Sequence, residues 1–81
     1  MPSSLMEKLV SAYICEWIFD KTRIKIEVSE DLFTVGKLDS LLFAELVAAI
    51  ENEFSTSVDF SALENWELIR TPIGLSEVVR F

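Results

Sequence analysis

The sequence contains no histidine, one cysteine and few basic side chains, and each scarcity excludes a class of function. Without histidine the chain has no Ser-His-Asp triad, no Cys-His pair and no typical transition-metal site. A single cysteine cannot form an internal disulfide. Seven Lys and Arg against 14 Asp and Glu give a net charge of −7, which argues against binding nucleic-acid phosphates or an anionic membrane surface. We therefore expect no metal, no nucleic acid, no membrane insertion and a basic protein partner.

Long apolar runs are also missing, although 51% of the 81 residues are hydrophobic. No stretch approaches the roughly 18 apolar residues of a membrane span, and the N-terminal Met1-Pro2-Ser3-Ser4 lacks the basic start of a secretory signal. The length leaves room for one domain, and the apolar content is too high for a disordered acidic tail. We expect a single domain over residues 1–81, free-standing, monomeric and cytoplasmic.

The first helix is predicted over residues 5–19. Ser4 followed by Glu7 has the spacing of a capping box, which marks the start of a helix. Apolar residues then recur at helical spacing, namely Met6, Leu9, Val10, Tyr13, Ile14 and Trp17. Cys15 lies beside this stripe, and we interpret it as a small hydrophobic residue rather than a nucleophile.

Residues 20–39 are predicted to form a long extended loop. Alternating apolar residues suggest a strand, but no second alternating run is present to pair with it. We expect Ile26 and Val28 to anchor the loop in the core, and Gly36 to relieve a turn of the backbone. Because loops of about 20 residues are uncommon in small domains, this length suggests a functional role.

The remaining chain predicts three further helices. Residues 41–54 carry a core stripe and have Asp39 or Ser40 as N-cap, and the stripe comprises Phe43, Leu46, Val47, Ile50 and Phe54. An extended link over 58–60 and a short helix over 61–66 follow. Thr71-Pro72 then begins a last helix that carries Ile73, Leu75, Val78 and Val79. The predicted fold is all-α: a small four-helix bundle, with three main helices, a short third one and a long loop between the first two.

The excess of acidic residues is concentrated in one half of the chain. Residues 39–69 contain seven carboxylates and no Lys or Arg, whereas the remainder has seven residues of each sign. One face of the helix over 41–54 combines small, apolar and acidic residues, namely Leu41, Ala44, Glu45, Ala48, Glu51 and Asn52. This face is either a docking surface for basic partners or an acidic surface that only keeps the protein soluble.

Ser40 stands where a long loop meets this acidic helix, and here the sequence resembles the acyl, aminoacyl and peptidyl carrier proteins. The resemblance rests on Asp39-Ser40-Leu41, Glu45-Leu46-Val47, residues 50–54 and Thr71-Pro72. It implies that Ser40, flanked by Asp39 and Leu41, is the acceptor of a covalent 4′-phosphopantetheine from coenzyme A. A phosphopantetheinyl transferase would attach this group, and the protein would carry a thioester on it without being an enzyme.

The details of the motif resemble particular branches of that family. Ser40-Leu41-Leu42 is similar to the peptidyl-carrier pattern, while Asp31-Leu32-Phe33 and Asn65-Trp66 resemble stand-alone D-alanyl and other aminoacyl carriers. The resemblance implies an aminoacyl group, or a polyketide or nonribosomal-peptide intermediate, as cargo. Adenylation, ligase or acyltransferase enzymes with basic docking patches would be the partners. D-alanyl transfer for cell-wall polymer modification, and a small acidic helical adaptor without a prosthetic group, stay open as alternatives.

Three further apolar residues are interpreted individually. Leu42 shares a face with Glu45 and should be partly exposed, so it either contacts a partner or is exposed without a role. Phe43 belongs by spacing to the core stripe. Trp66 is interpreted as a core aromatic residue, and the alternative is that it lines a cleft for cargo.

Overall fold

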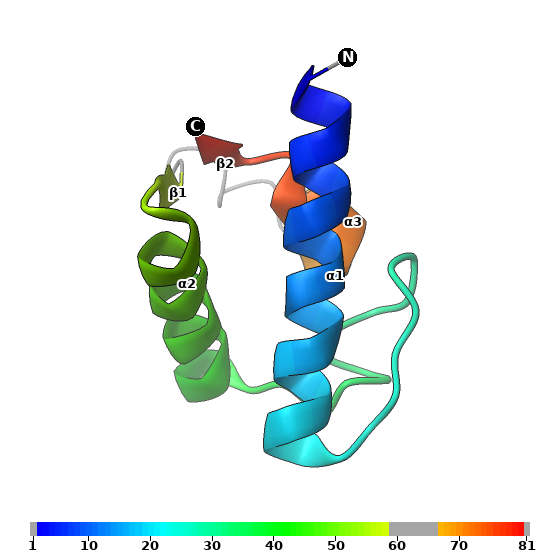
Figure 1. The fold of residues 1–81 in the computed structure, drawn as a ribbon. Coiled ribbons are helices and arrows are strands. Elements are labelled where there is room, and N and C mark those ends of the chain that lie inside the picture. Colours follow the sequence, from blue (N-terminus) through cyan, green and yellow to red (C-terminus); the bar gives the residue numbers. More distant parts are fainter. Residues whose placement is uncertain (1, 59–66, 81) are drawn as a thin grey trace.

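The computed structural model describes residues 2–58 and 67–80 (Figure 1). The elements in chain order are α1 (Pro2–Thr22), α2 (Ser40–Phe54), β1 (Ser57–Val58), η2 (Leu68–Arg70), α3 (Pro72–Ser76) and β2 (Val79–Arg80). Within these ranges the domain is all-α, as predicted, with three helices and the 3₁₀ turn η2. The predicted short helix over 61–66, with Asn65 and Trp66, lies outside the described residues, so a fourth helix stays a prediction.

The helix α1 is longer at both ends than predicted. It begins at Pro2, whose fixed φ suits the first turn, so Ser4 lies inside the helix and the predicted capping box was wrong. At the other end Arg23 adopts a left-handed φ of 61°, and its N–H donates to the Phe19 carbonyl at 2.8 Å. This conformation ends the helix after Thr22.

The core lies where α1 packs against α2 and α3, with α2 alongside α1 in Figure 1. Tyr13 of α1 meets Phe54 of α2 edge to face, with ring centroids 5.5 Å apart. Both helices contribute buried aliphatic residues, which are Val10, Ile14 and Ile18 from α1 and Leu46, Val47 and Ile50 from α2. Leu9 is 49% exposed, so its predicted place in the core stripe was wrong.

Residues 23–39 connect α1 to α2 without regular structure, as predicted. Ile26, Leu32 and Leu38 are buried and anchor this segment in the core. The predicted anchor Val28 is instead exposed, and its backbone carbonyl accepts the Ile73 N–H at 3.0 Å. The segment therefore meets the C-terminal part of the chain through its backbone at the position where the sequence predicted a side-chain contact.

Gly36 has the structural role that the sequence predicts. A Cβ at this position would lie 2.6 Å from the Leu32 carbonyl oxygen, which is closer than non-bonded atoms approach. The Leu38 N–H donates to the same oxygen at 3.1 Å, and Lys37 takes a left-handed φ of 59°. The chain thus turns tightly just before α2, and only glycine fits there without displacing the backbone.

The C-terminal helix begins as predicted but ends earlier. Thr71 caps α3 by accepting the Gly74 N–H at 3.0 Å, and Pro72 occupies the first turn. The helix ends at Ser76 instead of continuing through Val79, because β2 pairs antiparallel with β1. Val58 lies opposite Val79 in that ladder, where β-branched residues are favourable. Among residues 2–58 and 67–80, no helix has the length and apolar character needed to cross a membrane.

Candidate functional site

Ser40 is the first residue of α2, and its side chain is exposed. Asp39 precedes it with extended backbone angles and caps the helix in two ways. Its carboxylate accepts the Leu42 N–H at 2.8 Å, and its carbonyl accepts the Phe43 N–H at 2.8 Å. The local sequence therefore places the Ser40 hydroxyl at the accessible start of a well-capped helix.

This position suits a serine that is modified rather than one that catalyses. The first turn of a helix directs backbone N–H groups and the positive end of its dipole outward, which favours an anion such as a phosphodiester. The Asp39 carboxylate is used as the cap, and the chain has no histidine that could act as a base for Ser40. The exposed Ser40 hydroxyl has room for a large substituent, so a phosphate ester fits the site.

The three residues after Ser40 differ in exposure, as their helical positions require. Leu41 is 71% exposed, Leu42 is half-buried against the core, and Phe43 is half-buried. The Phe43 ring packs against Phe33 of the preceding segment, with centroids 5.6 Å apart. The prediction that Leu42 is partly exposed is confirmed. An apolar side chain thus stands in solvent next to Ser40.

The residues of the predicted docking face of α2 are exposed, apart from one. Five of its six members are exposed, namely Leu41, Ala44, Glu45, Ala48 and Asn52. Glu51 is half-buried, and its carboxylate oxygen Oε2 accepts the Val58 N–H of β1 at 3.0 Å. This structural role of Glu51 was missed, because nothing in the sequence pairs it with a backbone group seven residues further on.

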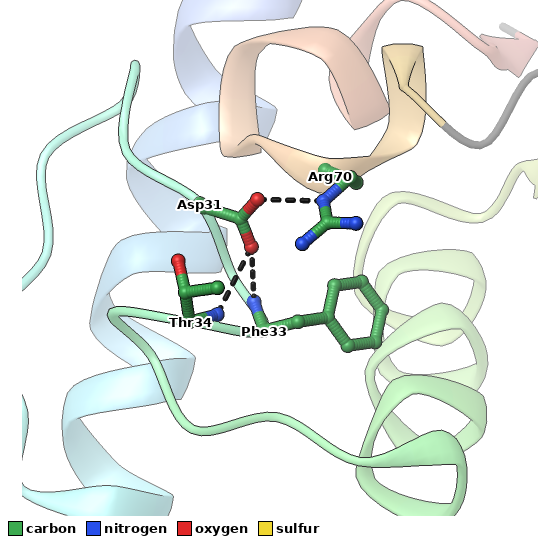
Figure 2. Close-up of polar contacts among 4 residues, drawn as sticks. All are labelled: Asp31, Phe33, Thr34 and Arg70. Atoms are coloured by element: carbon green, nitrogen blue, oxygen red, sulfur yellow. Dashed lines mark hydrogen bonds and ion pairs between the residues drawn. The ribbon is translucent and has the colours of Figure 1, made fainter.

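A second polar cluster fixes the segment that leads to Ser40 (Figure 2). Arg70 of η2 donates from Nε to Asp31 Oδ2 at 2.6 Å. The other oxygen of Asp31 accepts the backbone N–H groups of Phe33 and Thr34, at 2.8 and 3.0 Å. The Leu32 N–H donates to the Arg70 carbonyl at 2.6 Å, so side chain and backbone bind the same two segments. The cluster therefore ties the loop to the C-terminal part of the chain.

The electrostatics of this cluster favour the ionised carboxylate. The hydrogen bond from Arg70 holds the pKa of Asp31 below its ordinary value of 3.8, and the N–H groups of Thr34 and Phe33 add to this effect against partial burial. The Arg70 guanidinium also lies 5.8 Å from the Phe33 ring centroid. Since Phe33 packs on Phe43, the contacts run from Arg70 to the first turn of α2. An Asp followed by turn residues predicts the local bonds, whereas Arg70 could not have been found from the sequence.

The described part of the chain offers little support for a metal site or a reactive cysteine. No group of three or more His, Cys, Asp or Glu side chains there is arranged to hold a metal. Cys15 is half-buried and packs at the edge of the core. Burial raises the pKa of its thiol, and the carboxylates of Glu27, Glu16 and Glu30 raise it further. A protonated, half-buried thiol agrees with the interpretation of Cys15 as a small hydrophobic residue.

Comparison with known proteins identifies the class to which this site belongs. Residues 12–79 match the phosphopantetheine attachment site family, so the chain belongs to this family of carrier proteins, which bear a prosthetic group and are not catalysts. The resemblance predicted from the sequence is therefore confirmed, as is the cofactor. Proteins of this family are modified by a phosphopantetheinyl transferase.

One curated relative is more specific. A D-alanyl carrier protein from Streptococcus uberis is 35% identical to this chain over 75 residues, which cover 89% of the chain and 91% of the relative. No solved structure matches the chain.

Proposed function

We propose that Ser40 is the residue that bears the phosphopantetheine, and that residues 1–81 form one carrier domain. The observation that carries the proposal is the exposed Ser40 hydroxyl at the capped start of α2 in a chain of this family. Asp39 supports the site by capping the helix, and Leu41 offers an apolar contact beside it. The group supplies a terminal thiol that can hold cargo as a thioester.

In the attachment reaction the Ser40 hydroxyl oxygen forms a bond to the phosphorus next to the pantetheine in coenzyme A. The phosphoanhydride bond breaks, and adenosine 3′,5′-bisphosphate leaves with the electron pair. The serine proton passes to the transferase or to solvent. The carrier contributes an accessible hydroxyl and a helix N-terminus that favours the phosphodiester anion, while the transferase supplies the catalysis.

The exposed face of α2 is proposed as the surface that partner enzymes bind. It begins at Leu41, next to Ser40, and carries the exposed carboxylate of Glu45. Residues 39–69 contain no Lys or Arg, so a basic patch on a partner would meet no opposing cation in this part of the sequence. The transferase and an adenylating ligase or acyltransferase are the proposed partners, recognised by charge and by the apolar side chain of Leu41.

We propose an aminoacyl group as the cargo, with D-alanine as the first candidate. The support is the 35% identity to a D-alanyl carrier protein across most of both chains. A polyketide or peptide intermediate is the second candidate, because Leu42 follows Ser40-Leu41 as in peptidyl carriers.

The attachment is tested by incubating the protein with a promiscuous phosphopantetheinyl transferase and coenzyme A and measuring its intact mass. The parent should gain one phosphopantetheinyl group, Ser40→Ala should gain none, and Ser29→Ala, which removes another exposed hydroxyl, should react like the parent. Modification of Ser40→Ala would refute the assignment. An unmodified parent would instead favour the acidic adaptor without a prosthetic group.

The cargo is tested on the protein purified from its host. Intact-mass measurement before and after hydroxylamine treatment reveals any thioester, and fragmentation identifies the released group. Chiral chromatography of the released amino acid is needed as well, because D-alanine and L-alanine have the same mass. A D-alanyl group supports the first candidate, whereas a longer acyl or peptidyl group overturns it and leaves the attachment site unaffected.

A further inference from the structure

An apolar stripe on α1 faces solvent, on the side of the helix opposite the core. It comprises the apolar residues Leu5, Leu9, Ala12 and Phe19 and one charged residue, Glu16, all of which are exposed. Their spacing alternates between four and three residues, so their side chains lie within about 40° of one line along the helix. The buried residue Ile14 lies about 180° away. The helix α1 is therefore apolar on two opposite faces, and the described part of this chain covers only one of them.

The two ends of this stripe differ in shape. At the C-terminal end an open groove of about 610 Å³ is lined by Cys15, Glu16, Phe19, Asp20, Lys25 and Ile26. At the N-terminal end Leu5 protrudes and is 61% exposed. Leu5 and Phe19 lie seven residues to either side of Ala12, the smallest member of the stripe. The protruding Leu5 and the groove beside Phe19 are thus equally far from Ala12 along the helix.

The charges beside the stripe follow the same arrangement. Lys8 lies four residues before Ala12, and Glu16 lies four residues after it; both are exposed. Within one helix these two side chains are about 12 Å apart along the axis, so they cannot pair with each other. In an antiparallel pair of helices centred on Ala12, each Lys8 would lie opposite the other copy's Glu16. A parallel pair would bring like charges together.

We propose that the stripe binds a second copy of this chain, with the two α1 helices antiparallel and Ala12 near the two-fold axis. Leu5 of each copy enters the groove beside Phe19 of the other, and two Lys8–Glu16 ion pairs form across the interface. The self-complementary order of projection, small residue and hollow favours a second copy over an unrelated helix, because a two-fold interface pairs each residue with its counterpart on the other side. This proposal departs from the monomer that the sequence predicts.

The dimer should be weak and reversible. One helix face from each copy is a small interface, and the net charge of −7 on each copy opposes association. The acidic excess lies in residues 39–69, whereas the rest of the chain, which includes α1, is neutral. We expect a dissociation constant between about 10 µM and 1 mM. Salt screens the overall repulsion between the copies and also the two exposed ion pairs, whereas it does not weaken the apolar contacts.

Sedimentation equilibrium of the full chain from micromolar to millimolar concentration tests the association. The parent should show a monomer–dimer equilibrium, and Leu9→Lys should abolish it. The matched control Leu41→Lys removes a more exposed leucine from α2 and should leave the equilibrium unchanged. A parent that stays monomeric at millimolar concentration would overturn the proposal, and so would equal loss of dimer in both variants.

Charge exchange tests the arrangement. Lys8→Glu and Glu16→Lys should each weaken the dimer severalfold, and the double variant should recover most of the loss, because the pair then forms with its signs reversed. Failure of the double variant to recover would contradict the antiparallel pairing.

Cross-linking fixes the position of the two-fold axis without relying on affinity. In a Ser40→Ala, Cys15→Ser background the only thiol is the one introduced. Ala12→Cys should form a disulfide-linked dimer on mild oxidation, and Leu5→Cys should not, since its counterpart lies at the far end of the partner helix. Preferential linking of Leu5→Cys would overturn the antiparallel model. Neither result depends on the phosphopantetheine.

Discussion

Two segments meet at Ser40, the irregular chain of residues 23–39 and the helix α2, and they keep their shape by different means. In α2 the backbone bonds repeat along the helix, and the buried residues Leu46, Val47 and Ile50 share the packing. The segment 23–39 depends on a few individual contacts instead, above all the buried Leu32 and the Asp31–Arg70 pair.

Because of this difference, we expect the two segments that flank Ser40 to have different roles. The helix can present a surface to partners because its outward face, from Leu41 to Asn52, contributes little to its packing. The segment before it instead sets where α2 begins, through the turn at Gly36 and the buried Leu38. Substitutions should therefore affect stability in the segment and partner kinetics on the helix. Four predictions test this division, in order of decreasing effect.

Leu32→Ala should have the largest effect. Leu32 is fully buried in a segment with few other anchors, and removing most of a buried leucine side chain costs roughly 2–5 kcal/mol of unfolding free energy. Val35→Ala, three residues further on and exposed, is the control and should leave stability nearly unchanged. Urea unfolding followed by circular dichroism measures both, and equal losses would remove the special role of Leu32.

Gly36→Ala should come next, at about 1–3 kcal/mol, because the new methyl group would displace the Leu32 carbonyl. The displacement also disturbs the bond from the Leu38 N–H to that carbonyl, just before the helix. We expect slower phosphopantetheinylation together with the lower stability. If the variant is as stable as the parent in thermal unfolding, the turn can accommodate a methyl group and the prediction is wrong.

The ion pair between Asp31 and Arg70 should contribute about 1 kcal/mol, since both side chains are partly exposed. The folded state lowers the pKa of Asp31, so this contribution is complete above the ordinary value of 3.8 and is lost as pH falls through the lower folded value. Asp31→Asn should be less stable than the parent at neutral pH and should lose less stability in acid. Urea midpoints measured between neutral pH and strongly acidic solution test this, and parallel pH profiles would contradict it.

The smallest effect on stability is expected on the helix face, where the readout is kinetic. Glu45→Lys should lower kcat/KM of the transferase severalfold at low salt and less at high salt, with unchanged unfolding, because an exposed charge acts on encounter. Glu51→Lys should also lower stability, since its carboxylate accepts the Val58 N–H.

Glu51→Gln provides the matched control, because its amide oxygen can still accept that bond while the charge is removed. It should keep the stability of the parent and lose a smaller part of the rate. If Glu45→Lys leaves the rate unchanged at low salt, the face is an acidic surface without a docking role.

The parts of the structure that follow from local sequence could be predicted, and the parts that depend on distant partners could not. The cap by Asp39, the helix after it and the Thr71-Pro72 start are local, and all three are present. The Ser4 cap failed because Pro2 starts the helix earlier. Helical spacing assigned Leu9 to the core, but spacing alone cannot tell which side of a helix with two apolar faces is covered.

The contacts of Arg70 and Val79 depend on segments far away in the chain, and the contact of Glu51 depends on a strand seven residues further on. The Asp31–Arg70 pair joins residues 39 apart in sequence, and β2 exists because β1 lies beside it. Local sequence patterns alone therefore predict that the last helix continues through Val79, whereas the structure has a turn and the strand β2 after Ser76. The local geometry around Ser40 could be predicted because Ser40, its cap Asp39 and the exposed face all belong to one helix and its N-cap, whereas the role of Ser40 stays a prediction.

The raised pKa of Cys15 would have a consequence if the protein carries a thioester, as proposed. A thiolate attacks thioesters, whereas a thiol hardly does, so a reactive cysteine on the carrier itself could remove the cargo from its arm. Burial and the nearby carboxylates of Glu27, Glu16 and Glu30 keep Cys15 protonated at neutral pH. The only sulfhydryl of the polypeptide is therefore a weak nucleophile at neutral pH, which would protect a thioester on the proposed arm from attack by the carrier itself.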